Sequence, residues 1–303
     1  LHHSRTMQTD RMNLDSLHEL AKKLPKGYKE NAEALLARMG EVIEGIGDEP
    51  IRWKPPLLRL VQGTTDRTSI PKGTAIGDML LGEQKLEQPV KIIPLRMWTG
   101  RQYWSPDQNE NKMLCSSPDG KLGYTYGYCN QCQYSVFNEE TRKSECSKTK
   151  NILVIKSDFS ELFQVTFAKT NYKVGMELES LMKKAGVAPY RRVYGLTSET
   201  NSQYKNVENF AIEILDAKER VTDEALIPFL TELFKVIGED RKESIDRFYE
   251  IVNERREQGQ LAAPEPTFGG ADSTVLIEDG SSDGASADGG EAQVSDLARN
   301  YQV

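Results

Sequence analysis

Histidine is nearly missing from this chain, because only three occur in 303 residues. They are His2, His3 and His18, all close to the start of the sequence. A histidine general base, a Cys–His pair and a Ser–His–Asp triad all need an imidazole in the body of the protein. Phosphate-loop, dinucleotide-binding and HExxH motifs are missing as well. The sequence therefore predicts a protein that is not an enzyme.

Long apolar segments are missing too. No run approaches the roughly 18 apolar residues that a membrane-spanning helix needs. Residues 1–6 lack the apolar stretch of a secretory signal peptide. We therefore expect a cytoplasmic protein without a membrane partner, in the cytoplasm of the host cell if the protein is viral.

The net charge of −7 is unevenly distributed. Residues 51–216 contain 23 Lys and Arg against 18 Asp and Glu, a net charge of +5. Residues 259–303 contain eight acidic residues and only Arg299, a net charge of −7. This last segment is rich in Gly, Ser, Ala and Asp, so we expect a disordered acidic tail. A basic centre beside it favours a polyanion-binding surface, although a solvated surface with a solubilising tail has the same pattern.

The periodicity of apolar residues predicts helices in residues 14–24, 30–45, 175–185, 222–237 and 241–257. Strand patterns occur in residues 90–98, 101–104, 151–155, 163–169, 190–198 and 207–215, with a turn at Thr99 and Gly100. The order predicts an α+β fold with a small barrel of the oligonucleotide-binding (OB) type, although another small barrel or an α+β sheet would give the same pattern.

The predicted organisation has four parts. They are an N-terminal helical segment (1–50), an OB-like domain (51–216) with a zinc-lobe insertion at 112–150, C-terminal helices (217–258) and the acidic tail (259–303).

All four cysteines lie within 32 positions, at Cys115, Cys129, Cys132 and Cys146. The central pair forms a CxxC motif, and thirteen residues separate it from each outer cysteine. Four thiolates complete the tetrahedral shell of a structural Zn²⁺ ion and leave no open position for catalysis. Two disulfides are the alternative, and the lack of a signal peptide favours the metal.

Three segments combine aromatic and cationic residues in the manner of single-strand binding sites. Their candidate contacts are Trp98, Arg101, Tyr103 and Trp104 in the first, Lys169, Tyr172 and Lys173 in the second, and Tyr190, Arg192 and Tyr194 in the third. A strand would place the three residues of the last segment on one face. The same aromatics are equally suited to a protein core, with the cations at its surface.

The four cysteines, the strands predicted around them and the acidic tail together resemble the zinc-containing single-stranded DNA-binding proteins of tailed phages. The stretches IPKGTAIGDML, PLRMW and FAKTNYKVG are also similar to phage replication-region proteins. In the first family a histidine is among the zinc ligands, whereas all four are cysteine here. The resemblance implies non-enzymatic binding of single-stranded DNA in phage replication or recombination, with replication proteins docking on the tail.

Two questions stay open at this level. The pattern does not distinguish DNA from RNA. The alternative function is a zinc-ribbon adaptor, or a transcription or replication accessory protein, that acts through protein contacts.

Overall fold

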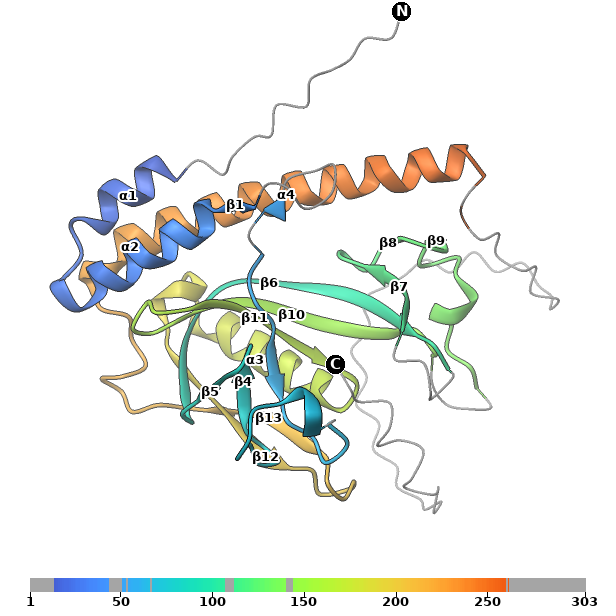
Figure 1. Cartoon of the computed structure of the whole chain (residues 1–303), viewed down its shortest axis with the longest axis horizontal. Helices are drawn as coiled ribbons and strands as arrows, with labels where there is room; N and C mark the ends of the chain where they lie inside the picture. Colours follow the sequence, from blue (N-terminus) through green and yellow to red (C-terminus); the bar gives the residue numbers. More distant parts are fainter. Residues whose placement is uncertain are drawn as a thin grey trace, which may run out of the picture.

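The computed structural model describes residues 14–43, 51–52, 54–65, 67–106, 112–139, 144–259 and 261. Helices and antiparallel sheets both occur, which confirms the predicted α+β class. In Figure 1, α3 (Tyr172–Ala185) lies below the main sheet and the other α-helices lie above it. The upper three are α1 (Asp15–Ala21), α2 (Lys26–Gly40) and α4 (Ile227–Glu257). Among the described residues, no helix is long and apolar enough to cross a lipid bilayer.

The main sheet is antiparallel, with strands in the order β11-β10-β6-β12-β13 and β7 paired to the end of β6. α3 connects β11 to β12. The strand bounds are β6 Val90–Trp104, β7 Met113–Ser117, β10 Ser147–Lys156, β11 Leu162–Ala168, β12 Tyr194–Thr200 and β13 Glu208–Glu213. Within the described ranges β11 and β13 do not pair with each other, so the sheet does not close into a barrel.

Smaller sheets complete the fold. A three-stranded sheet lies against both β11 and β13, and Leu57 forms a parallel bridge to Gln164 of β11. Its strands are β3 Leu58–Leu60, β4 Met79–Leu81 and β5 Gln84–Leu86. Two strand pairs are shorter: β1 Val42–Ile43 with β2 Ile51–Arg52, and β8 Leu122–Gly123 with β9 Gly127–Tyr128.

Alternation along β10 divides its side chains between two cores, because successive residues of a strand point to opposite faces. Ile152 and Val154 join a cluster with β11, α3 and the three-stranded sheet. Leu153 and Ile155 join a second cluster with α1, α2 and α4. Both faces of this strand are therefore covered, in accordance with its continuous apolar run.

α3 packs unusually close to the sheet at Gly175. A Cβ atom there would lie 2.7 Å from the Cβ of Lys150 and 2.9 Å from that of Phe167. One turn further along α3, Glu179 Oε2 forms an ion pair with Lys150 Nζ at 2.7 Å, and both side chains are largely buried. The glycine and the ion pair together fix the start of α3 over the N-terminal end of β10.

Several predicted element boundaries are wrong. The helix expected at 30–45 ends at Gly40, and Val42–Ile43 within that range is a strand. The turn expected at Thr99 and Gly100 does not form, because both residues stay paired with β10 in one strand of 15 residues. The two helices expected at 222–237 and 241–257 are one helix of 31 residues. Pro228 lies in its first turn, where its missing N–H removes no helical hydrogen bond. The predicted tail lies outside the described residues, except for Gly259 and Leu261.

Candidate functional site

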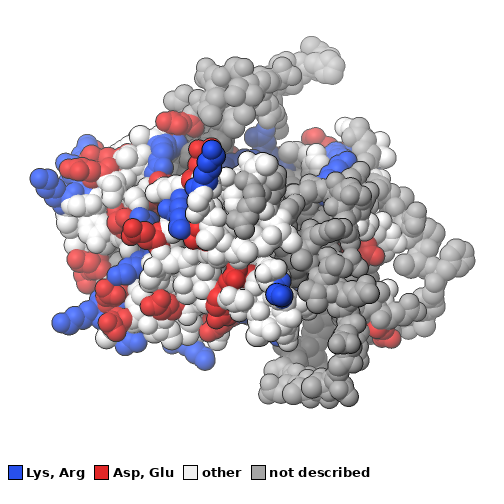
Figure 2. Space-filling model, turned by 60° about the horizontal axis from the view of Figure 1, so that its bottom comes forward, with Lys and Arg blue, Asp and Glu red and all other residues white. Residues whose placement is uncertain are grey.

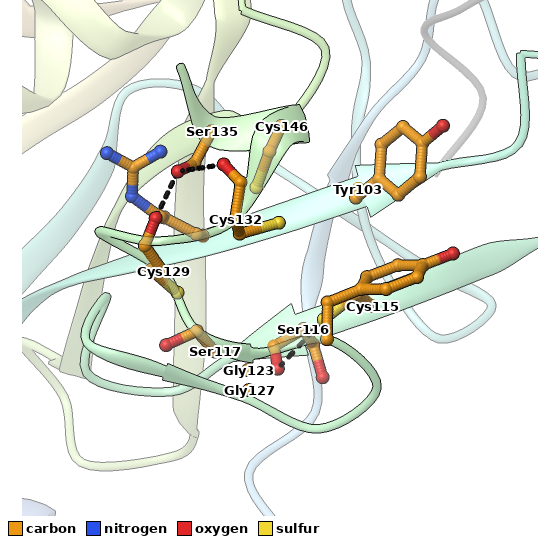
Figure 3. A pocket seen from close by; sticks show the side chains of 12 residues that line it. Tyr103, Cys115, Ser116, Ser117, Gly123, Gly127, Cys129, Cys132, Ser135 and Cys146 are labelled. Carbon is orange, nitrogen blue, oxygen red and sulfur yellow. Dashed lines mark hydrogen bonds between the residues drawn. The ribbon is translucent and has the colours of Figure 1, made fainter. Parts of the chain in front are cut away.

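The four cysteines line one pocket (Figure 3). Cys115 comes from β7, Cys129 and Cys132 from the turn after β9, and Cys146 directly precedes β10. Cys129, Cys132 and Cys146 are 7–8% exposed. The pocket therefore brings together cysteines from the connection between β6 and β10, and the described residues 113–139 and 144–146 of that connection are called the lobe below.

Backbone hydrogen bonds position the cysteines. The N–H of Cys129 donates to the carbonyl of Lys121 at 2.8 Å, and that of Cys146 donates to Tyr134 at 2.7 Å. The hydroxyl of Ser135 donates to the carbonyls of Cys129 and Cys132, which shapes the CxxC turn (Figure 3). The lobe thus depends on turns and local hydrogen bonds more than on the two apolar cores.

The donor set suits a thiophilic metal ion. All four cysteines are free thiols. Burial raises the pKa of Cys129, and it raises the pKa of Cys146 to about 11. Buried thiols of this kind stay protonated unless a cation stabilises the thiolates, and metal binding would release the protons. Among the described residues, no three metal-ligating side chains are already close enough to hold an ion, so a metal would have to draw the sulfurs together.

Two further observations fit a metal in this pocket. A Cβ atom at Gly123 would lie 2.8 Å from the Sγ of Cys115, so only glycine leaves room for that sulfur. Arg101 lines the pocket, and its Nη1 is buried without a hydrogen-bond partner in the described part of the chain. Arg101 as a whole is half-buried, and a metal bound by four thiolates would supply negative charge beside its buried nitrogen.

Tyr103, expected as a stacking platform, packs inside the lobe. It is 5% exposed, and its ring stacks on Tyr134 with 4.3 Å between centroids. Its hydroxyl donates to Glu145 at 3.1 Å. Burial, together with this carboxylate, raises the pKa of Tyr103. The ring therefore stabilises the lobe instead of facing solvent.

The C-terminal half of α4 holds the lobe from above (Figure 1). Tyr249 donates to Asp119 Oδ2 at 2.6 Å, and Arg241 donates to the carbonyl of Pro118 at 2.8 Å. The Arg241 guanidinium lies 3.9 Å from the ring centroid of Trp98, which is half-buried. Trp98 is thus engaged by α4, and this helix contact was not predicted from the sequence.

Two of the three predicted nucleic-acid segments meet at one end of the sheet. Strand register places Lys148 opposite Arg101, and Thr149 opposite Ala168, the residue before Lys169. Lys148 and Lys173 are exposed, whereas Trp104, Lys169 and Tyr172 are half-buried. This end of β10 and β11, beside the lobe, is called the lysine edge below and is defined by Lys148, Lys169, Tyr172 and Lys173. Lys148 was not predicted, although it follows Cys146 by two residues.

The third segment does not form the predicted face. Pro189–Arg191 is a 3-10 turn, and the strand begins only at Tyr194. Tyr190 packs against Phe234 of α4, with 5.5 Å between ring centroids, while Tyr194 is 8% exposed in the other core. Arg192 forms a bridge to Val221. Alternation starts after the proline turn, so the two tyrosines point to different cores.

On the face shown in Figure 2, Lys and Arg are interspersed with Asp and Glu. Local groups such as the lysine edge are therefore the candidates for contacts with an anion. No protein-family model, curated protein or solved structure matches this chain.

Proposed function

We propose that this chain is a non-enzymatic single-stranded DNA-binding protein with an OB-like domain and a structural zinc lobe. The observation that carries the proposal is the strand arrangement. β6, β10 and β11 are followed by α3 and then by β12 and β13, and β6 pairs with both β10 and β12. OB domains have five strands in a partly open barrel, and they bind oligonucleotides over strands two and three and the loops 1–2 and 4–5.

The lobe and the lysine edge occupy the corresponding places. The lobe is the connection between the first and second strands, β6 and β10. The lysine edge lies at the ends of the second and third strands, β10 and β11. Lysines there attract the phosphate backbone, and Tyr172 offers a ring for base stacking. Trp104, at the end of β6, is the second candidate ring.

Zinc is proposed as a structural ion held by Cys115, Cys129, Cys132 and Cys146. When bound, it cross-links the lobe through four thiolates and adds no open coordination position. The segments between the cysteines contain little apolar surface, so the folding free energy of the lobe would come mainly from metal ligation. The lobe would then present a fixed wall beside the lysine edge.

Fluorescence titration with a dT oligonucleotide at several salt concentrations tests the binding function. Affinity should fall linearly on a double-logarithmic salt plot, with a slope of about −0.7 per phosphate contact. Lys148→Ala and Lys173→Ala should each reduce the slope by about 0.7. Tyr172→Leu keeps most of the packing volume and should weaken binding by about 1–3 kcal/mol through loss of stacking.

Lys184→Ala is the matched control. Lys184 is exposed on the same helix as Lys173 but about 16 Å further along, at 1.5 Å per residue. If Lys184→Ala weakens binding as much as Lys173→Ala, the contact is general charge attraction and not the lysine edge. If no dT binding occurs at low salt, the single-strand function is wrong.

The alternative, an adaptor that binds another protein, is favoured by one observation. Val136 and Phe137, between Cys132 and Cys146, are 58% and 60% exposed. Exposed apolar side chains on a small lobe are typical of protein contact sites. The same titration discriminates the two functions, because an adaptor would show no salt-dependent affinity for dT.

A further inference from the structure

We propose that Arg101 is the charge partner of the four-cysteine site and strengthens its hold on a divalent metal ion, instead of contacting nucleic acid. The inference rests on the proposed zinc lobe. It reassigns a residue whose sequence context predicts strand binding, since Arg101 lies between Trp98 and Tyr103.

Strand geometry directs Arg101 to the cysteines. Residues two apart in a strand share a face, and Arg101 and Tyr103 of β6 both line the cysteine pocket. Lys148 is the register partner of Arg101 on β10, yet it is exposed and does not line the pocket. Of these two paired cations, only Arg101 is available to the thiols.

Two carboxylates of the lobe have other partners. Glu145 accepts from Tyr103 at 3.1 Å, and Asp119 accepts from Tyr249 at 2.6 Å. No described carboxylate forms an ion pair with Arg101, and its Nη1 is buried without a partner in the described residues. This half-buried guanidinium has no described counter-charge unless the pocket itself becomes negative.

Metal binding would make the pocket negative. Four thiolates around one divalent cation carry a net charge of −2, and one adjacent guanidinium reduces it to −1. Arg101 lines the same pocket as all four cysteines, so its guanidinium lies beside the charge that metal binding would create. Groups that contact metal ligands in this way typically change metal affinity by about 10- to 100-fold when they are removed.

Zinc affinity of the full-length protein, measured by competition with a chromophoric chelator at one pH, tests the inference. Arg101→Met removes the charge but keeps much of the volume, and it should weaken zinc binding by about 10- to 100-fold. Arg101→Lys keeps the charge without the planar fork and should lose less. Lys121→Met is the matched control. It removes an exposed cation of the same lobe and should stay within about twofold of the wild type, as expected outside the metal's contact shell.

Co²⁺ absorption separates this inference from the metal site itself. A four-thiolate spectrum in both wild type and Arg101→Met shows that the ligands are unchanged and that any loss of affinity comes from the missing charge. If the wild type gives no such spectrum and binds no zinc, the site is wrong and the role of Arg101 falls with it. If Arg101→Met does not fold, the zinc affinity of Arg101→Lys is compared with that of the wild type to test the role of Arg101.

Two results would overturn the assignment of Arg101 while leaving the zinc site intact. One is wild-type zinc affinity in Arg101→Met. The other is a loss of dT affinity that persists when Arg101→Met is saturated with zinc, because the residue would then contact the strand. At saturating zinc we expect its dT affinity to equal that of the wild type.

Discussion

The hydrogen bond from Tyr249 to Asp119 should control how firmly the lobe is docked on α4. Tyr249→Phe removes only the hydroxyl, which donates to Asp119 Oδ2 at 2.6 Å. Asp119 Oδ1 still accepts from the N–H groups of Lys121 at 2.9 Å and Leu122 at 3.3 Å, so the turn itself survives. Burial acts to raise the pKa of Asp119, but these donors outweigh it and hold the pKa below its usual value. The acceptor is therefore ionised at neutral pH.

The magnitude follows from the kind of hydrogen bond. A bond to a charged group contributes about 1.5–3 kcal/mol, and both partners are half-buried, so we take about 1.5 kcal/mol. Local opening of the lobe should then become about tenfold more frequent. Hydrogen exchange measures this directly, and the amides of Lys121 and Leu122 should exchange about tenfold faster in Tyr249→Phe.

Tyr190→Phe is the control, because it removes a neutral 3.2 Å hydrogen bond from Thr231 in the other half of α4. It should leave exchange in the lobe unchanged. The reasoning fails if Tyr249→Phe exchanges like the wild type at these two amides. It also fails if α1 and α2 lose protection as much as the lobe does, since the effect would then be global.

Three further predictions concern the metal, the α3 ion pair and the tail. Protein purified without added metal should contain one zinc per chain by elemental analysis. Cys132→Ser should lower that zinc content. A metal-free, fully oxidised protein of normal stability would contradict the zinc site. Glu179→Gln should destabilise the protein by about 2 kcal/mol at pH 7 in urea unfolding, because it leaves Lys150 without its charged partner. The hydrogen bond from Lys150 lowers the pKa of Glu179 below 4.5, so this stabilisation is present above that pH and is lost as pH falls through the folded pKa. The difference in free energy of unfolding between the wild type and Glu179→Gln should therefore become smaller at acidic pH. A difference that does not change with pH would show that the ion pair is not its cause. Deleting residues 262–303 should tighten dT binding, most clearly at low salt, since a tethered acidic segment competes at about millimolar effective concentration; equal affinities at low salt would exclude competition.

Local pattern was sufficient for several elements. Period-two alternation in residues 163–169 predicts β11, whose Phe163, Val165 and Phe167 are all buried. Helical spacing in residues 175–185 predicts most of α3. The cysteine spacing predicts one zinc site, and the four cysteines do line a single pocket, while the zinc ion itself stays a prediction. These features depend on residues that are near one another in the sequence.

The sequence by itself therefore determined the α+β class, the main helices and the five strands β6, β10, β11, β12 and β13, but none of the other strands. Only the tertiary structure decided which partner each side chain meets. Pairing with β10 carries β6 through Gly100, where local pattern indicates a turn. The packing of α4, more than 100 residues downstream, covers Trp98, and the lobe takes up Arg101. Alternation along a strand predicts the face of the sheet to which each side chain points. Which helix or loop covers that face depends on residues distant in the sequence.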